Sequence, residues 1–129
     1  LEKDNSFYNW CMRDINYKYP HYLLNTLFDS INGNNKVKTM VVDENSWIFK
    51  NTNLKNNEEF GLKIIPLEGD KSYNDKHIVA KSPNDSYHFI VKNNGKGFVI
   101  SFGSITWTHN ILISKPCSQI LCNIFKKIN

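Results

Sequence analysis

The sequence predicts a single α+β domain over residues 1–129, in which N-terminal helices and a C-terminal amphipathic helix pack on an antiparallel sheet of six or seven strands. Three observations predict this class: apolar residues recur at helical spacing near both ends, they alternate with polar residues across the middle, and turn residues separate the alternating stretches. Helices grouped at the termini around successive strands favour an antiparallel meander over a parallel sheet.

Two helices are expected in the N-terminal third of the chain. The first would cover residues 6–15, with Ser6 as its N-cap, and the second would begin near Pro20, which suits the first turn of a helix. Gly33 favours the end of this second helix. Its apolar residues recur at helical spacing: Leu23, Leu24, Leu27, Phe28 and Ile31.

The middle of the chain alternates with a period of two and predicts a series of strands. Polar loops are expected over residues 51–59 and 68–76, and the Ser-Pro-Asn-Asp sequence at residues 82–85 is typical of a turn. The expected strands are Val37–Val42, Trp47–Lys50, Phe60–Leu67, His77–Lys81 and Ser86–Lys92.

A β-hairpin over residues 87–102 is the clearest local signal. Asn94-Gly95 supplies the positive φ angles that a tight hairpin turn requires. We expect the aromatic residues of this hairpin to face the core. A last strand is expected over Ser104–Ser114, with a bend near His109-Asn110.

The C-terminal helix has Pro116 in its first turn and Lys126 and Lys127 at the end where the helix dipole favours positive charge. Its apolar stripe consists of Cys117, Ile120, Leu121, Ile124 and Ile128. The sheet is then either curved beneath this helix or closed into a small barrel that the helix caps. The second arrangement resembles a pleckstrin-homology domain in element order, although the last helix lacks the tryptophan usual in that family.

Composition indicates the kind of genome more than the function. The chain holds 19 Asn and 15 Lys but one Arg, a bias typical of the A/T-rich genome of a parasite, virus or low-GC bacterium. The net charge is +4, and no acidic residue follows Asp85. This acid-free stretch, residues 86–129, is the one electrostatic feature that suggests an anionic partner.

Three cysteines cannot all pair within one chain. Cys11, Cys117 and Cys122 each lie among apolar residues, so we expect three buried thiols. One disulfide from Cys11 to Cys117 or Cys122 is the alternative. No apolar run reaches the ~18 residues of a membrane span, so no transmembrane segment is expected.

No metal site or cofactor is expected, because the four histidines form neither H-x-x-x-H nor H-x-H and no C-x-x-C occurs. Metal-free RNA cleavage needs a general base, a general acid and a cation. If the aromatic face of residues 86–92 is buried, His88 and Lys92 point outward together, and His109 would lie on a neighbouring strand. These three residues are the candidate catalytic set of a small ribonuclease or toxin domain; an ordinary solvated sheet face is the alternative interpretation.

The leading functional prediction is a non-enzymatic protein-interaction module with a protein partner. Three tryptophans and six tyrosines exceed what the core requires, and aromatic anchors commonly dominate interfaces. The predicted binding residues are Trp10, Tyr17, Tyr19, Lys81, Lys92 and Lys96. The alternatives are the ribonuclease and a phosphate- or lipid-headgroup-binding domain, for which nucleic acid or anionic lipid would be the partner.

Overall fold

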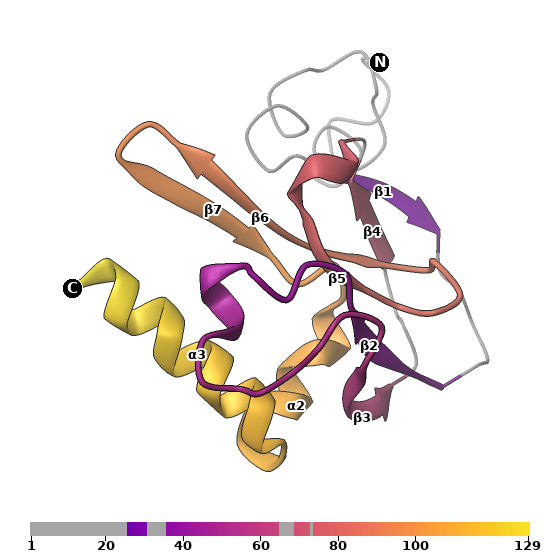
Figure 1. Ribbon diagram of the computed structural model, residues 1–129. Coiled ribbons are helices and arrows are strands. Elements are labelled where there is room, and N and C mark those ends of the chain that lie inside the picture. Colours follow the sequence, from indigo (N-terminus) through magenta and orange to yellow (C-terminus); the bar gives the residue numbers. More distant parts are fainter. Residues whose placement is uncertain (1–25, 31–35, 65–68, 73) are drawn as a thin grey trace, which may run out of the picture.

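The computed structural model describes residues 26–30, 36–64, 69–72 and 74–129, which form three layers (Figure 1). A five-stranded antiparallel sheet lies between a helical layer and a two-stranded ribbon. The predicted α+β class is confirmed, but the sheet has five strands and not the six or seven that the sequence predicts. The predicted helix over residues 6–15 lies outside the described residues.

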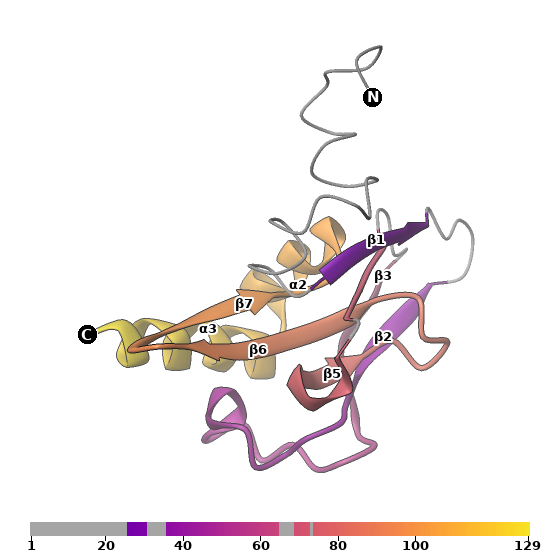
Figure 2. The same ribbon diagram turned by 90° about the horizontal axis from the view of Figure 1, so that it is seen from above.

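The sheet has the strand order β3-β2-β5-β6-β7, and it curls into a half-barrel (Figure 2). All of its neighbouring strands are antiparallel. Its strands are β2 (Val37–Val41), β3 (Glu59–Ile64), β5 (Ile78–Lys81), β6 (His88–Asn94) and β7 (Gly97–Ser101). Each of them falls within or overlaps a strand that the sequence predicts, so the alternation of apolar and polar residues locates this sheet correctly.

The predicted β6–β7 hairpin is confirmed, with a turn one residue later than predicted. Asn94 pairs with Gly97, so the two turn residues are Gly95 and Lys96. Among the described residues of this turn, only Gly95 has a positive φ (59°). A positive φ at the first central position alone is the pattern of a type II′ turn, which suits the twist of a hairpin.

The ribbon joins two segments for which the sequence predicts no strand. Strand β1 (Thr26–Ser30) pairs with β4 (Gly69–Ser72) in an antiparallel manner. The prediction of a helix is therefore wrong over Thr26–Ser30, and the prediction of a loop over residues 68–76 is wrong over β4. Backbone pairing between distant segments overrides local pattern here, because the polar residues of β4 carry no strand signal of their own.

The predicted strand Trp47–Lys50 is instead a short 3₁₀ helix, η2 (Trp47–Phe49). Ile48 and Phe49 are both buried, which a strand facing one core cannot achieve with adjacent residues. Asn123 fixes this turn, since its Nδ2 donates to the carbonyl oxygens of Ile48 and Lys50 at 2.8 and 2.7 Å.

The predicted last strand, Ser104–Ser114, is also wrong. The chain forms the 3₁₀ helix η4 (Ile105–Thr108) and the short helix α2 (His109–Ile113). This helical turn buries both Trp107 and Asn110, three residues apart. The Asn110 Oδ1 accepts a hydrogen bond from the backbone N–H of Leu62 on the edge strand β3. The isoleucine and threonine residues of this segment favour a strand, but the long-range contact of Asn110 with the sheet edge stabilises a helical turn instead.

The C-terminal helix α3 (Lys115–Ile128) is confirmed, with Pro116 in its first turn. Its buried side is rotated from the predicted stripe, because Asn123 is buried and Ile128 is exposed. Cys117 is buried and Cys122 is exposed, and both thiols are free. The prediction that all three thiols are buried is therefore wrong at Cys122, while Cys11 lies outside the described residues.

The core confirms the predicted inward orientation of the hairpin aromatics. Tyr87 and Phe89 are fully buried, and Phe102 packs on Trp107 with ring centroids 4.2 Å apart. Thr39 Oγ1 accepts a hydrogen bond from Trp107 Nε1 at 3.0 Å and lies 2.9 Å from the Tyr87 hydroxyl. Burial raises the pKa of Tyr87 to about 12. The three polar groups satisfy one another, as a buried network must.

Gly95, in the hairpin turn, and Gly103, just after the hairpin, both have a positive φ but differ in how closely other atoms approach them. A Cβ on Gly103 (φ 69°) would lie 2.1 Å from the His88 carbonyl oxygen, whereas a Cβ on Gly95 (φ 59°) would meet nothing within 4 Å. We predict that Gly103→Ala lowers the free energy of unfolding by about 2–4 kcal/mol, because the backbone penalty and the clash add. Gly95→Ala carries only the backbone penalty, about 1 kcal/mol. Urea unfolding measures the free energy of unfolding of each variant. An equal decrease in the two variants would contradict the close packing at Gly103.

Candidate functional site

His88 lies at the junction between the sheet and the ribbon. It is the first residue of β6, and its neighbours Tyr87 and Phe89 belong to the core on the helical side. The His88 side chain therefore points to the opposite face of the sheet, as the sequence predicts, but it is only 6% exposed. The predicted outward, solvated position of His88 is wrong, because β4 lies against β6 on this face.

Both ring nitrogens of His88 are engaged. Nδ1 accepts a hydrogen bond from the backbone N–H of Ser72 at 3.0 Å. A backbone N–H can only donate, so this nitrogen carries no proton and the neutral ring holds its proton on Nε2. Nε2 then donates to Asp85 Oδ1 at 2.9 Å. The imidazole thus connects the last residue of β4 to the turn that precedes β6.

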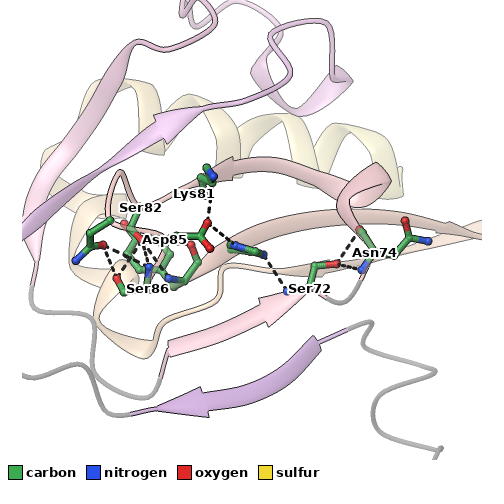
Figure 3. Close-up of polar contacts among 9 residues, drawn as sticks. Ser72, Asn74, Lys81, Ser82, Asp85 and Ser86 are labelled. Carbon is green, nitrogen blue, oxygen red and sulfur yellow. Dashed lines mark hydrogen bonds and ion pairs between the residues drawn. The ribbon is translucent and has the colours of Figure 1, made fainter.

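Asp85 is held in the left-handed backbone region, with φ 58°. Its Oδ1 also accepts from Lys81 Nζ at 3.1 Å, so one carboxylate oxygen receives two donors (Figure 3). Burial raises the pKa of Asp85, but the hydrogen bonds from His88 and Lys81 outweigh that effect and hold it below its usual value. The carboxylate is therefore the charged centre of this network.

The turn that carries Asp85 is built from short polar side chains (Figure 3). Ser82 Oγ accepts from the backbone N–H of Ser86 at 2.6 Å and lies 3.0 Å from the Ser86 hydroxyl, which in turn donates to Asn84 Oδ1 at 2.8 Å. Ser82 and Ser86 are buried. Because the turn is fixed from within, the Asp85 carboxylate stays directed at His88.

This network can hold two layers together, but its histidine is poorly placed for acid–base catalysis. A general base needs a nitrogen within reach of substrate, and both nitrogens of His88 already contact protein atoms. His109 is exposed on α2, and Lys92 is half-buried on β6. Lys92 lies four residues further along β6 than His88, and His109 lies on a separate element, α2.

The predicted binding residues are dispersed. Lys81 is paired with Asp85, and Lys96 is exposed in the hairpin turn, where β6 ends far from the His88 network. Trp10, Tyr17 and Tyr19 lie outside the described residues. Trp47 is half-buried beneath Lys127, whose Nζ is 5.8 Å from the centroid of its ring.

A second candidate feature is the exposed surface of η4, α2 and α3, which we call the helical surface. Leu112 is 89% exposed and Ile113 is 66% exposed at the corner where α2 meets α3. Of the seven large hydrophobic side chains that are exposed in the described part of the chain, five belong to this surface. These are Ile105, Leu112, Ile113, Phe125 and Ile128.

Sequence reasoning missed the main members of both features. Asp85 stands three residues before His88, a spacing at which a tight turn can return a carboxylate to the following strand, and this signal was available. Nothing near Ser72 in the sequence indicates its role, since its contact with His88 uses the backbone N–H, which every residue except proline has. The sequence predicts a strand at Leu112 and Ile113, and a strand would place one of these two neighbours inward.

Comparisons with protein-family models, with curated proteins and with solved structures found no match to this chain. Among the helices that the structure describes, none combines the length and the apolar character needed to cross a bilayer. Within the same residues, no group of three or more potential ligands is placed to hold a metal ion.

The Asp85 carboxylate gives a pH-dependent prediction. Since its folded pKa is depressed, its stabilisation is present above the ordinary aspartate value, 3.8, and is lost as the pH falls through the folded value. We predict that Asp85→Asn lowers the free energy of unfolding near neutral pH by about 1 kcal/mol, a modest amount because the side chain is half-exposed and screened. Asparagine keeps the preference for positive φ, so the backbone penalty is unchanged.

Urea unfolding at about pH 7 and about pH 3 checks this prediction. The difference between the wild type and the variant should shrink at the lower pH. Asp75→Asn is the matched control, because it removes the same charge from an exposed position and should have little effect. A loss of equal size at both pH values would contradict an ionic role for Asp85.

Proposed function

We propose that this chain is a non-enzymatic protein-interaction module that binds its partner through the helical surface. The observation that carries the proposal is the pair of exposed apolar side chains at the corner between α2 and α3, Leu112 and Ile113. Exposed leucine and isoleucine at one corner lose contact with water when a partner covers them. Burial of such side chains is worth roughly 1.5–3 kcal/mol each, which makes them suitable anchors.

The positive charge of the helical surface indicates what kind of partner it would bind. The helical surface belongs to the acid-free stretch after Asp85, and Lys115 and Lys126 are exposed on α3. Complementary charge steers association and disfavours wrong partners. We therefore expect a partner that presents apolar side chains surrounded by aspartate and glutamate.

The two alternatives have less support. The ribonuclease hypothesis uses His88 together with His109 and Lys92, but His88 is buried with both nitrogens engaged. A phosphate-binding site requires converging cations, whereas Lys115 and Lys126 lie at opposite ends of α3 and Lys127 lies over Trp47. A protein interface needs neither arrangement, because its energy comes mainly from buried apolar anchors within a polar rim.

Selection from a phage-displayed library of random peptides tests the proposal. The wild-type chain should enrich peptides in which acidic residues flank apolar ones. The double variant Leu112→Ser, Ile113→Ser should lose at least about tenfold in affinity for the enriched peptides, since about 1.4 kcal/mol of lost burial has that effect. Fluorescence anisotropy with a labelled peptide measures the affinity.

Val42→Ser is the matched control, because Val42 is also an exposed apolar residue but lies outside the helical surface. It should leave the affinity unchanged. Enriched peptides that bind the double variant as well as the wild type would overturn the proposed surface. Retention on vesicles of phosphatidylserine and phosphatidylcholine, with no enriched peptides, would overturn the protein partner in favour of a lipid one.

A further inference from the structure

We propose that His88 is a protonation-sensitive latch that holds the β1–β4 ribbon on the five-stranded sheet. The inference rests on the hydrogen bond from the Ser72 backbone N–H to His88 Nδ1, which joins the two sheets. It concerns a different face of the molecule from the helical surface, and neither proposal depends on the other.

The ribbon is a separate sheet. Strands β1 and β4 pair with each other, and neither pairs with a strand of the five-stranded sheet in the described residues. β4 lies against β6 across the layer boundary, on the face away from the helices (Figure 1). In the described residues, the hydrogen bond between the end of β4 and the sheet is therefore accepted by a side chain, His88, and is not part of a ladder of backbone hydrogen bonds.

Protonation breaks this attachment for a chemical reason. The neutral ring holds one proton on Nε2, so a second proton must go to Nδ1. That nitrogen would then become a donor, and it faces the backbone N–H of Ser72, which is a donor too. The hydrogen bond is lost, and two N–H groups are left opposed at the layer boundary. The backbone N–H of Ser72 then needs another acceptor or water.

The charged groups around His88 determine whether their electric field favours or disfavours the protonated ring. Asp85 from the turn attracts an imidazolium ion, while Lys81 from β5 repels it. The 3₁₀ helix η3 (Asp75–His77), which contacts β6, adds one exposed acidic and one exposed basic residue, Asp75 and Lys76, and a half-buried His77. β4 carries Asp70 and Lys71, of which only the backbone is described. Asp85 keeps its bond to Nε2 in either state, so the Ser72 contact is the one that changes.

Opening of the latch would expose apolar surface. Ile78 and Ile90 are cross-strand partners on β5 and β6, and both are buried. Neither belongs to the hydrophobic core on the helical side. They occupy the face against which β4 lies, so release of the ribbon uncovers a small apolar patch next to His88.

Hydrogen exchange of the Ser72 amide, followed by NMR on the full chain, tests the latch. Between about pH 8 and about pH 5, the range in which histidines change charge, protection corrected for intrinsic exchange should fall. The Tyr87 amide, which donates to Ser82 Oγ in the turn, should keep its protection throughout.

Two variants separate the latch from general acid sensitivity. His88→Asn places a non-titrating oxygen near the position of Nδ1, so Ser72 protection should become independent of pH. His109→Asn removes an exposed histidine and should leave the wild-type pH dependence intact. Constant Ser72 protection in the wild type, or an identical fall in the His88→Asn variant, would overturn the proposal. If His88→Asn fails to fold, the wild-type profile alone decides.

Discussion

The burial of both faces of β6 at its first residues is the constraint on which the rest of the structure depends. Tyr87 and Phe89 enter the core beneath α3, while His88 and Ile90 are sealed on the other side, against the ribbon. Two faces must therefore be covered, and the chain supplies helices for one and β4 for the other. A buried histidine on such a strand must be hydrogen-bonded, and Ser72 and Asp85 provide its partners.

The sequence predicts correctly those elements whose pattern is local, and it predicts wrongly those whose secondary structure depends on contacts with distant residues. The β6–β7 hairpin and α3 follow from Gly95, from Pro116 and from apolar spacing within a few residues. The 3₁₀ helix at Trp47 and the turn through Trp107 depend on Asn123 and Thr39, which are far away in the sequence. β4 has no apolar pattern at all, since its pairing is made by backbone groups.

The candidate site shows the same division. Alternation placed His88 on the face opposite Tyr87, which is correct, but it could not show that a ribbon covers that face. Solvation of the second face of a sheet depends on the whole fold, so one strand cannot predict it. The exposure of Leu112 and Ile113 could not be predicted for a different reason: the apolar residues around them predict a strand, and a strand would bury one of the two. Apolar residues at a surface and in a core have the same composition and differ only in what packs on them.

The protonation state of the His88 ring is the strongest test of the burial of both faces of β6. Long-range nitrogen–proton correlation spectra at about pH 7.5 distinguish the two neutral tautomers and the charged ring. We predict a neutral ring with its proton on Nε2 and an unprotonated, hydrogen-bonded Nδ1. A proton on Nδ1, or nitrogen shifts averaged between tautomers as for a solvated histidine, would contradict the burial of β6 on both faces and the attachment of the ribbon through His88.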